Sequence, residues 1–163
     1  MAKMETKGLD EVNKTLNRLG TAGKGLAKMA VYVGADVIAD EVRKTTEALR
    51  VSEPGRRKDT RKIYASVTDV EKKQLLQSLG IVKIQYEDGA WQTSIGFAGY
   101  GGRKTKAYPR GLPNALLARS VSKPSALRKG SRFTANALKR AQGRAVAEMA
   151  RTVDEGITKI IAE

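Results

Sequence analysis

The sequence contains no cysteine and no histidine among its 163 residues. Without cysteine the chain can form neither a disulfide framework nor a thiolate metal site, which fits a reducing compartment. Without histidine it lacks the commonest general base and the commonest metal ligand. An active site would therefore have to use carboxylates, lysine, serine or tyrosine.

Motifs for catalysis and metal binding are missing as well. The Asp and Glu residues form no DxD, DxDxDG or ExxE group that would suggest a metal site. Ser120 and Lys123 match the pattern Ser-x-x-Lys, but the companion motifs that give this pattern meaning are absent. The glycines beside Arg103 lack the Gly-x-x-x-x-Gly-Lys-Ser/Thr spacing of a nucleotide loop. We therefore expect a protein that is not an enzyme and that uses neither a cofactor nor a metal ion.

Large apolar residues are scarce, since 40% of the residues are apolar and only 5% are aromatic. No segment approaches the roughly 18 apolar residues of a membrane span, and Met1–Lys7 lacks the apolar region of a signal peptide. We expect a soluble protein, made in the cytoplasm, with no membrane partner. The length fits a single domain over residues 1–163. Because large apolar residues are scarce, we expect this domain to bury part of its apolar surface against other copies in an oligomer.

Acidic residues are absent from Gly89 to Ala147, a stretch of 59 residues. The same stretch holds 12 Lys or Arg residues, which supply +12 of the formal net charge of +14. A like-charged block of this length must face an acidic partner or spread over a large solvated surface. We interpret it as a folded binding surface with a mobile basic loop. The candidate polyanion- or partner-binding residues are Arg103, Lys104, Lys106, Arg110, Arg119, Lys123, Arg128, Lys129 and Arg132.

Long helices are predicted near both ends of the chain. Apolar residues recur at helical spacing between Leu9 and Leu19, and Gly20 is expected to close this first short helix. The pattern resumes at Leu26 and predicts a second helix of about 24 residues. A third, long amphipathic helix is predicted over residues 134–161. Its expected apolar stripe is Leu138, Ala141, Ala145, Met149, Val153, Ile157 and Ile160.

A short helix is predicted between the long ones, over residues 69–79. Thr68 or Ser66 can cap its N-terminus, and Gly80 is expected to end it. The charged segment 56–62 that precedes it is either a solvated connection or a further polyanion contact.

The clearest β signal is a hairpin with strands at 81–86 and 91–97 around a turn at Asp88-Gly89. We expect Trp91 to be a structural anchor in the core of this sheet, in preference to a base-stacking platform. The residues that share one face of the second strand are Trp91, Thr93, Ile95 and Phe97.

Residues 98–112 combine glycines, tyrosines and basic residues, and they are too many for a tight turn. We expect an exposed loop or arm there. Residues 112–121 form a short apolar element, either a helix or a strand that joins the sheet. Phe133, at the entry to the last helix, is expected to be a second, buried structural anchor.

The order of these pieces resembles a family of virion proteins. The opening Gly8-Leu9-Asp10-Glu11-Val12 looks like the family's first helix, and Leu75–Leu79 is similar to its Leu-x-x-Ser-Ile turn before a β-meander. Ser131–Leu138 resembles the entry to its last helix, although Lys72-Lys73 stand where the family has Thr-Gly. The family comprises the neck and tail-completion proteins of long-tailed bacteriophages, which include head–tail joining and minor tail proteins.

This resemblance implies an α+β fold, in which a small antiparallel β-sheet packs against two long α-helices, one N-terminal and one C-terminal, plus short helices. It also implies a structural virion protein without catalytic activity, assembled as a ring that joins head and tail. The implied partners are other copies of the chain, adjacent neck or tail-tube proteins, and the phage genome passing nearby. The implied location is the virion neck or tail, and the host cytoplasm during assembly.

A different class of function also fits the charge. A nucleic-acid-binding protein without sequence specificity would use the 12 cations to neutralise phosphates, and its affinity would fall steeply with salt. No helix-turn-helix, RNA-recognition or zinc signature indicates specific readout. The two hypotheses differ in oligomerisation, because only the first requires a ring of defined size.

Overall fold

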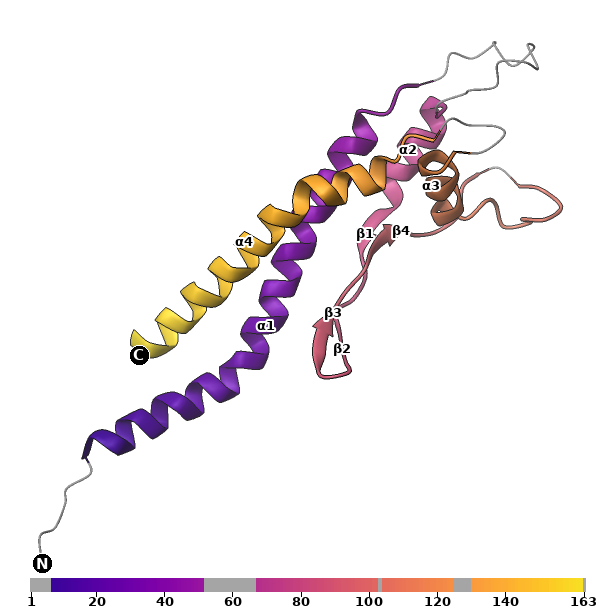
Figure 1. Ribbon diagram of the computed structural model, residues 1–163. Coiled ribbons are helices and arrows are strands. Elements are labelled where there is room, and N and C mark those ends of the chain that lie inside the picture. Colours follow the sequence, from indigo (N-terminus) through magenta and orange to yellow (C-terminus); the bar gives the residue numbers. More distant parts are fainter. Residues whose placement is uncertain (1–6, 52–66, 103, 125–129, 163) are drawn as a thin grey trace, which may run out of the picture.

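Two long antiparallel helices, α1 and α4, lie side by side; the short helices and β1 and β4 lie near one end of this pair, and the β2–β3 hairpin extends from there alongside the middle of α1 (Figure 1). The structure, a computed structural model, describes residues 7–51, 67–102, 104–124 and 130–162, with only the backbone for residues 7–11. The fold class is α+β, as predicted. The elements are α1 (Lys7–Glu47), α2 (Asp69–Ser78), β1 (Leu79–Ile81), β2 (Gln85–Glu87), β3 (Ala90–Gln92), β4 (Ile95–Phe97), α3 (Asn114–Ser122) and α4 (Phe133–Ala162).

α1 is one continuous helix of 41 residues. The predicted break after Leu19 is therefore wrong, and the two helices expected there are a single element. Gly20, Gly23 and Gly25 all lack the positive φ that ends many helices. A glycine costs a helix only about 1 kcal/mol relative to alanine, which does not stop a helix whose neighbouring turns are already formed.

α2 begins where the sequence predicted, because Thr68 caps it. The backbone N–H of Glu71 donates to Thr68 Oγ1 at 3.2 Å, and the Thr68 N–H donates to Glu71 Oε2 at 2.9 Å. This reciprocal arrangement is a capping box. The helix ends at Ser78, and the chain passes directly into β1. The alternative cap Ser66 and the charged segment 56–62 lie outside the described residues.

The hairpin turns at Asp88 and Gly89, as predicted, with positive φ at both residues, 52° and 80°. Each predicted strand is split in two, because β2 pairs with β3 next to the turn and β1 pairs with β4 further away. Three residues, 82–84, separate β1 from β2, whereas only two, 93–94, separate β3 from β4. The extra residue shifts the register, as a bulge does, and an alternating apolar pattern does not reveal it.

Trp91 contacts both its hairpin neighbour and α1. The Lys28 Nζ atom of α1 lies 5.5 Å from the centroid of the indole, and the Tyr86 ring meets it edge-on at 5.1 Å. Ring contacts of this kind add to the energy of the buried area. The four residues of the predicted face are half-buried, namely Trp91, Thr93, Ile95 and Phe97.

The element that the sequence left as helix or strand is a helix, α3, which begins after Pro113. It does not join the sheet as a strand, and the described backbone pairing next to it is an isolated antiparallel bridge between Tyr100 and Pro113. The residues that α3 buries are Asn114, Leu117, Ala118 and Val121.

α4 matches the predicted helix to within a residue at each end. Its predicted stripe is wrong at Leu138, whose side chain is 49% exposed. Ala137 occupies the buried position instead, and with Ala141 and Ala145 it forms a row at four-residue spacing that faces the rest of the chain. The larger leucine lies one position, about 100°, away from that row.

Small residues bring α1 and α4 close together. A Cβ atom added at Gly34 would lie 2.5 Å from Met149 Sδ, and one added at Gly156 would overlap Leu26. The same interface contains an ion pair, in which Arg144 Nη2 donates to Glu41 Oε2 at 2.6 Å. Because higher numbers on one helix face lower numbers on the other, these contacts show the antiparallel pairing directly.

The hydrophobic core lies at the end of the molecule where α2 and α3 pack on the helix pair. Phe133, the first residue of α4, is 3% exposed there, and its ring meets that of Phe97 edge-on at 6.0 Å. The buried core residues are Val42, Val67, Leu75, Leu79, Leu117, Ala118, Val121, Phe133 and Ala137. Away from this end, the β2–β3 hairpin extends alongside the middle of α1, and α1 and α4 continue as a helix pair (Figure 1).

Candidate polyanion-binding surface

The loop between β4 and α3, residues 98–112, is closed at its base by backbone hydrogen bonds. The N–H of Gly101 donates to the Leu112 carbonyl at 2.7 Å, and the N–H of Asn114 donates to the Gly99 carbonyl at 3.0 Å. A Cβ atom at Gly111 would overlap the Gly101 carbonyl oxygen, so the two sides of the base are in direct contact. We call this segment the basic loop. Its described residues 102 and 104–110 are exposed, and its two ends are joined by these contacts.

A side chain reinforces the same base. Asn114, the first residue of α3, is 6% exposed, and its Nδ2 atom donates to the Ala98 carbonyl at 2.8 Å. On the other side, Gly101 lies against the Gln74 side chain of α2. The basic loop is thereby anchored to both short helices.

The tip of the basic loop is also closed. Thr105 and Tyr108 exchange two backbone hydrogen bonds of 3.1 Å each, and the N–H of Gly111 donates to the Tyr108 carbonyl at 3.0 Å. All the described residues from Lys104 to Arg110 are exposed. The loop therefore holds its cations outside the core on a hydrogen-bonded backbone.

Residues 130–132, just before α4, form a corner that is held against the last turn of α3. The N–H groups of Ser131 and Arg132 donate to the carbonyls of Val121 and Ser122, both at 2.9 Å. Gly130 has a φ of 73°, and any Cβ atom there would overlap the backbone at Pro124. These contacts place the residue before α4 next to the last turn of α3.

The structure brings the described candidate cations to one end of the molecule, the end that carries the basic loop, α3 and the start of α4 (Figure 1). Arg103, Arg128 and Lys129 lie outside the described residues. The described members are all exposed, and they are Lys104, Lys106, Arg110, Arg119, Lys123 and Arg132.

None of these six cations forms an ion pair within the described part of the chain. An acidic residue on neighbouring α2, Asp69, accepts from Lys73 at 2.7 Å. That hydrogen bond and the attraction of Asp69 raise the pKa of Lys73 above its ordinary value. The negative charge of Asp69 is thus already paired with Lys73 on the same helix. We call the six residues the cationic end.

Arg132 stands at an unfavourable place for a cation. It immediately precedes α4, whose first turn contains no acidic residue. A helix N-terminus carries a partial positive charge, so a bound anion would stabilise this corner.

The last three cations of the acid-free stretch belong to α4. Lys139 and Arg140 are exposed, whereas Arg144 is held by Glu41, whose side chain is only 12% exposed. Arg144 therefore serves the α1–α4 interface and does not contribute a free charge to the surface.

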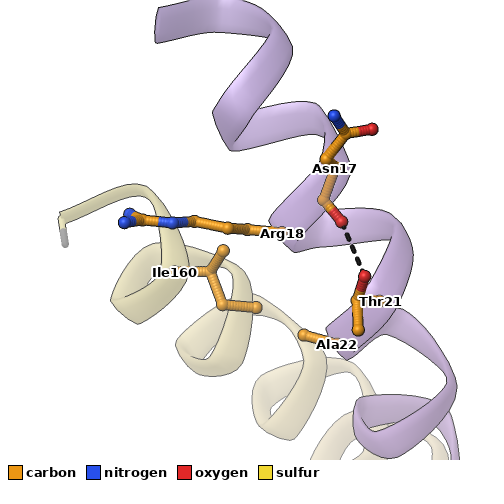
Figure 2. A pocket seen from close by; sticks show the side chains of 5 residues that line it. All are labelled: Asn17, Arg18, Thr21, Ala22 and Ile160. Carbon is orange, nitrogen blue, oxygen red and sulfur yellow. Dashed lines mark hydrogen bonds between the residues drawn. The ribbon is translucent and has the colours of Figure 1, made fainter.

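A shallow pocket lies at the other end of the helix pair, where α4 finishes. Figure 2 shows its lining, with Asn17, Arg18, Thr21 and Ala22 from α1 and Ile160 from α4. Thr21 Oγ1 donates to the Asn17 carbonyl at 3.0 Å, and the Arg18 side chain extends from α1 toward the last turns of α4. Among the described residues, this lining contains one cation, Arg18, and no carboxylate.

Over the described residues, no group of three or more Asp or Glu side chains is arranged to hold a metal ion. No helix in the same part of the chain is long and apolar enough to cross a membrane. Comparisons of the chain with protein-family models, with curated proteins and with solved structures give no match.

Sequence reasoning missed the residues that shape the basic loop. Asn114 gave only a weak signal, as a polar residue between Pro113 and an apolar run. Tyr108 was recognised only as part of a flexible segment, but it forms the hydrogen-bonded tip and its side chain is 37% exposed. The contact between Gly101 and Gly111 depends on the folded path of the chain, and no local pattern indicates it.

Proposed function

We propose that the chain is a structural, non-catalytic protein of a tailed-phage virion, a neck or tail-completion component that forms a ring with copies of itself. Two observations support this proposal. The first is the resemblance in the order of motifs and elements, from the Gly8-Leu9 opening to the long C-terminal helix. The second, which carries the proposal, is an apolar stripe of α1 whose N-terminal members, Val12 and Leu16, are exposed and not covered by any part of the described chain.

α1 projects beyond the end of α4. Gly34 faces Met149, Leu26 faces Gly156, and the pocket in Figure 2 brings Ile160 to Arg18 and Ala22. α4 ends at Ala162, so the α1 residues before the pocket have no α4 opposite them. We call residues 7–16 the projecting segment. At 1.5 Å per residue it is about 15 Å long.

The stripe that faces α4 continues into the projecting segment. Its members recur every three or four residues, the spacing of helices that pack side by side, and they are Val12, Leu16, Leu19, Gly23, Leu26, Ala30 and Gly34. Along this row the exposed fraction falls from 54% at Val12 and 58% at Leu16 to 3% at Ala30. This pattern is typical of a helix interface in which the surface that would cover Val12 and Leu16 belongs to another molecule.

The occupant that we infer is a second copy of the chain. Its α4 presents Val146, Ala147 and Ala150 on an exposed outer face, and small side chains of this kind allow a helix to approach closely. Lys14 and Arg18 flank the projecting stripe, whereas α4 carries the exposed Asp154 four residues after Ala150, so the two surfaces include charges of opposite sign. A contact between two different surfaces of identical copies is heterologous, and such contacts can close into rings.

Light scattering of nuclease-treated protein in moderately high salt tests the proposal. We expect a single closed multiple of the 17.7 kDa chain. Leu16→Gln in the projecting segment and Ala147→Glu on the outer face of α4 should each reduce the mass, because each disrupts one side of the same contact. A wild-type chain that remains monomeric at all concentrations would contradict self-assembly.

Met29→Gln provides the matched control. Met29 is 56% exposed on α1, which is nearly the exposure of Leu16, but it lies outside the projecting segment. Its substitution should leave the mass unchanged. If Met29→Gln and Leu16→Gln reduce the mass equally, the contact is not the one inferred here.

A second candidate function is favoured by the cationic end. Six exposed cations without ion pairs among the described residues could neutralise phosphates of a nucleic acid, which requires no sequence readout. This function does not depend on a ring. The two functions are compatible in one protein, and the mass measurement and a binding measurement test them separately.

A further inference from the structure

The basic loop combines three features that positive charge alone does not account for: an ordered backbone, cations on both sides of the tip, and an exposed tyrosine. We propose that it binds a single nucleic-acid strand, with Lys104, Lys106 and Arg110 on the phosphates and Tyr108 against a base. This inference rests on the second candidate function and names the element that performs it.

Hydrogen bonds hold the described backbone of the loop at its tip and at its base. Thr105 and Tyr108 close the tip by two reciprocal hydrogen bonds, Thr105 Oγ1 also accepts from the Tyr108 N–H at 3.1 Å, and Gly101 and Leu112 close the base. A segment that is already ordered loses less conformational entropy on binding than a disordered one. The loop can therefore present its side chains to a partner without first folding.

The side chains alternate along this backbone. Lys104 and Lys106 lie on either side of Thr105, and Arg110 follows Tyr108 by two residues. The three cations are exposed, and Tyr108 exposes 37% of its surface at the tip. Pro109 next to it has a fixed φ, which restricts the backbone at the aromatic residue.

These features favour a nucleic acid over an acidic protein. An acidic protein surface would require only the cations, whereas exposed aromatic rings beside cations are the combination that binds single-stranded nucleic acids. The ring stacks on a base while the cations follow the backbone. A single strand is favoured over a duplex, because the base faces of a duplex are already stacked on each other.

Fluorescence anisotropy with fluorescein-labelled oligo(dT) over a series of salt concentrations tests the inference on the full chain. The triple variant Lys104→Gln, Lys106→Gln, Arg110→Gln should reduce the slope of log K against log salt by about 2, because three phosphate contacts are lost. Tyr108→Ala should weaken binding about 5- to 150-fold at an unchanged slope. Tyr108→Phe should retain wild-type affinity, since it keeps the ring.

A charge-matched control separates the loop from overall charge. Lys24→Gln, Lys83→Gln and Lys159→Gln remove three exposed cations on α1, between β1 and β2, and on α4, all outside the cationic end and the projecting segment. This control should leave the slope close to that of the wild type. Circular dichroism of every variant should show unchanged helix content, because none of the substituted side chains is buried.

The outcomes distinguish the inference from the function on which it rests. Wild-type protein that fails to bind oligo(dT) even at low salt would overturn both. If the wild type binds and the loop variants bind equally well, the nucleic-acid function stands and the loop assignment is wrong. If a duplex or polyglutamate binds as tightly as oligo(dT) and Tyr108→Ala has no effect, the strand-stacking role is wrong.

Discussion

The N-terminal half of α1, residues 7–25, and its C-terminal half, residues 26–47, share one helix but differ in what surrounds them. The C-terminal half buries Ala30, Ala39 and Val42, each exposed by no more than 6%. The N-terminal half exposes Val12 and Leu16 by more than half, and a Cβ added at Gly20, Gly23 or Gly25 would have nothing within 4 Å.

This difference shows that the helix is not maintained by local sequence alone. Starting a helix is costly, but extending it by one residue from a formed turn is nearly free. The packed half supplies the formed turns, and the glycine-rich half extends from them. The three predictions below therefore concern the packed end, the interface between α1 and α4, and the N-terminal half of α1, in order of decreasing effect on stability.

Phe133→Ala should have the largest effect, because it removes a ring at the centre of the packed end. Phe133 is 3% exposed and contacts the Phe97 ring. We expect a loss of about 3–5 kcal/mol in the free energy of unfolding, measured with urea, since the cavity cannot be filled by its neighbours. A loss below about 0.5 kcal/mol would show that the ring does not anchor α4.

Leu138→Ala is the control for this prediction. Leu138 lies on the same helix but is 49% exposed, so its truncation should cost about 0.5 kcal/mol or less. An equal cost at both positions would mean that the buried row does not run through Ala137.

Arg144→Gln should have an intermediate effect, at the interface between α1 and α4. The substitution leaves Glu41, which is 9% exposed, without its cation. Because the Arg144 side chain is 56% exposed and partly screened by water, we expect a loss of about 1–2 kcal/mol, below that of a fully buried pair. Urea unfolding would measure it.

Arg140→Gln is the control. It removes an exposed cation one turn before Arg144 on α4, and Arg140 forms no ion pair with the described residues. This substitution should change the free energy of unfolding by less than about 0.5 kcal/mol. A double-mutant cycle with Glu41→Gln isolates the coupling. A coupling energy near zero would show that the 2.6 Å contact contributes nothing to stability.

Much of the fold was predictable, because its signals are local. The cap at Thr68, the turn at Asp88-Gly89 and the bounds of α4 each follow from a few neighbouring residues. The errors arose where distant segments decide the outcome. Whether Leu138 or Ala137 is buried depends on the closeness of α1, and the continuity of α1 depends on its packing against α4, which lies more than 100 positions away in the sequence.

The candidate surface was predictable in charge but not in shape. A stretch without acidic residues predicts exposed cations, and the described members are exposed. Their arrangement depends on the contact of Gly101 with Gly111, on Asn114, and on the corner at Gly130, which are all tertiary contacts. Composition suggested a flexible arm there, because it cannot show that the glycines serve a close approach.

Gly25→Ala should have the smallest effect of the three predictions, and it should be stabilising. Gly25 is exposed within α1 and has open space where a Cβ would lie. Alanine restricts the unfolded chain and favours the helix, which is worth about 0.5–1 kcal/mol. The gain should appear as slower amide hydrogen exchange in the N-terminal half of α1, because that half opens without unfolding the core.

Gly89→Ala is the opposite control. Gly89 also has open space around it, but its φ is 80°, which an alanine rarely adopts. That substitution should therefore destabilise the hairpin while Gly25→Ala stabilises α1. If Gly25→Ala instead speeds exchange in α1, the glycine-rich stretch is not helical in solution, and the projecting segment would lose its fixed orientation toward a second copy.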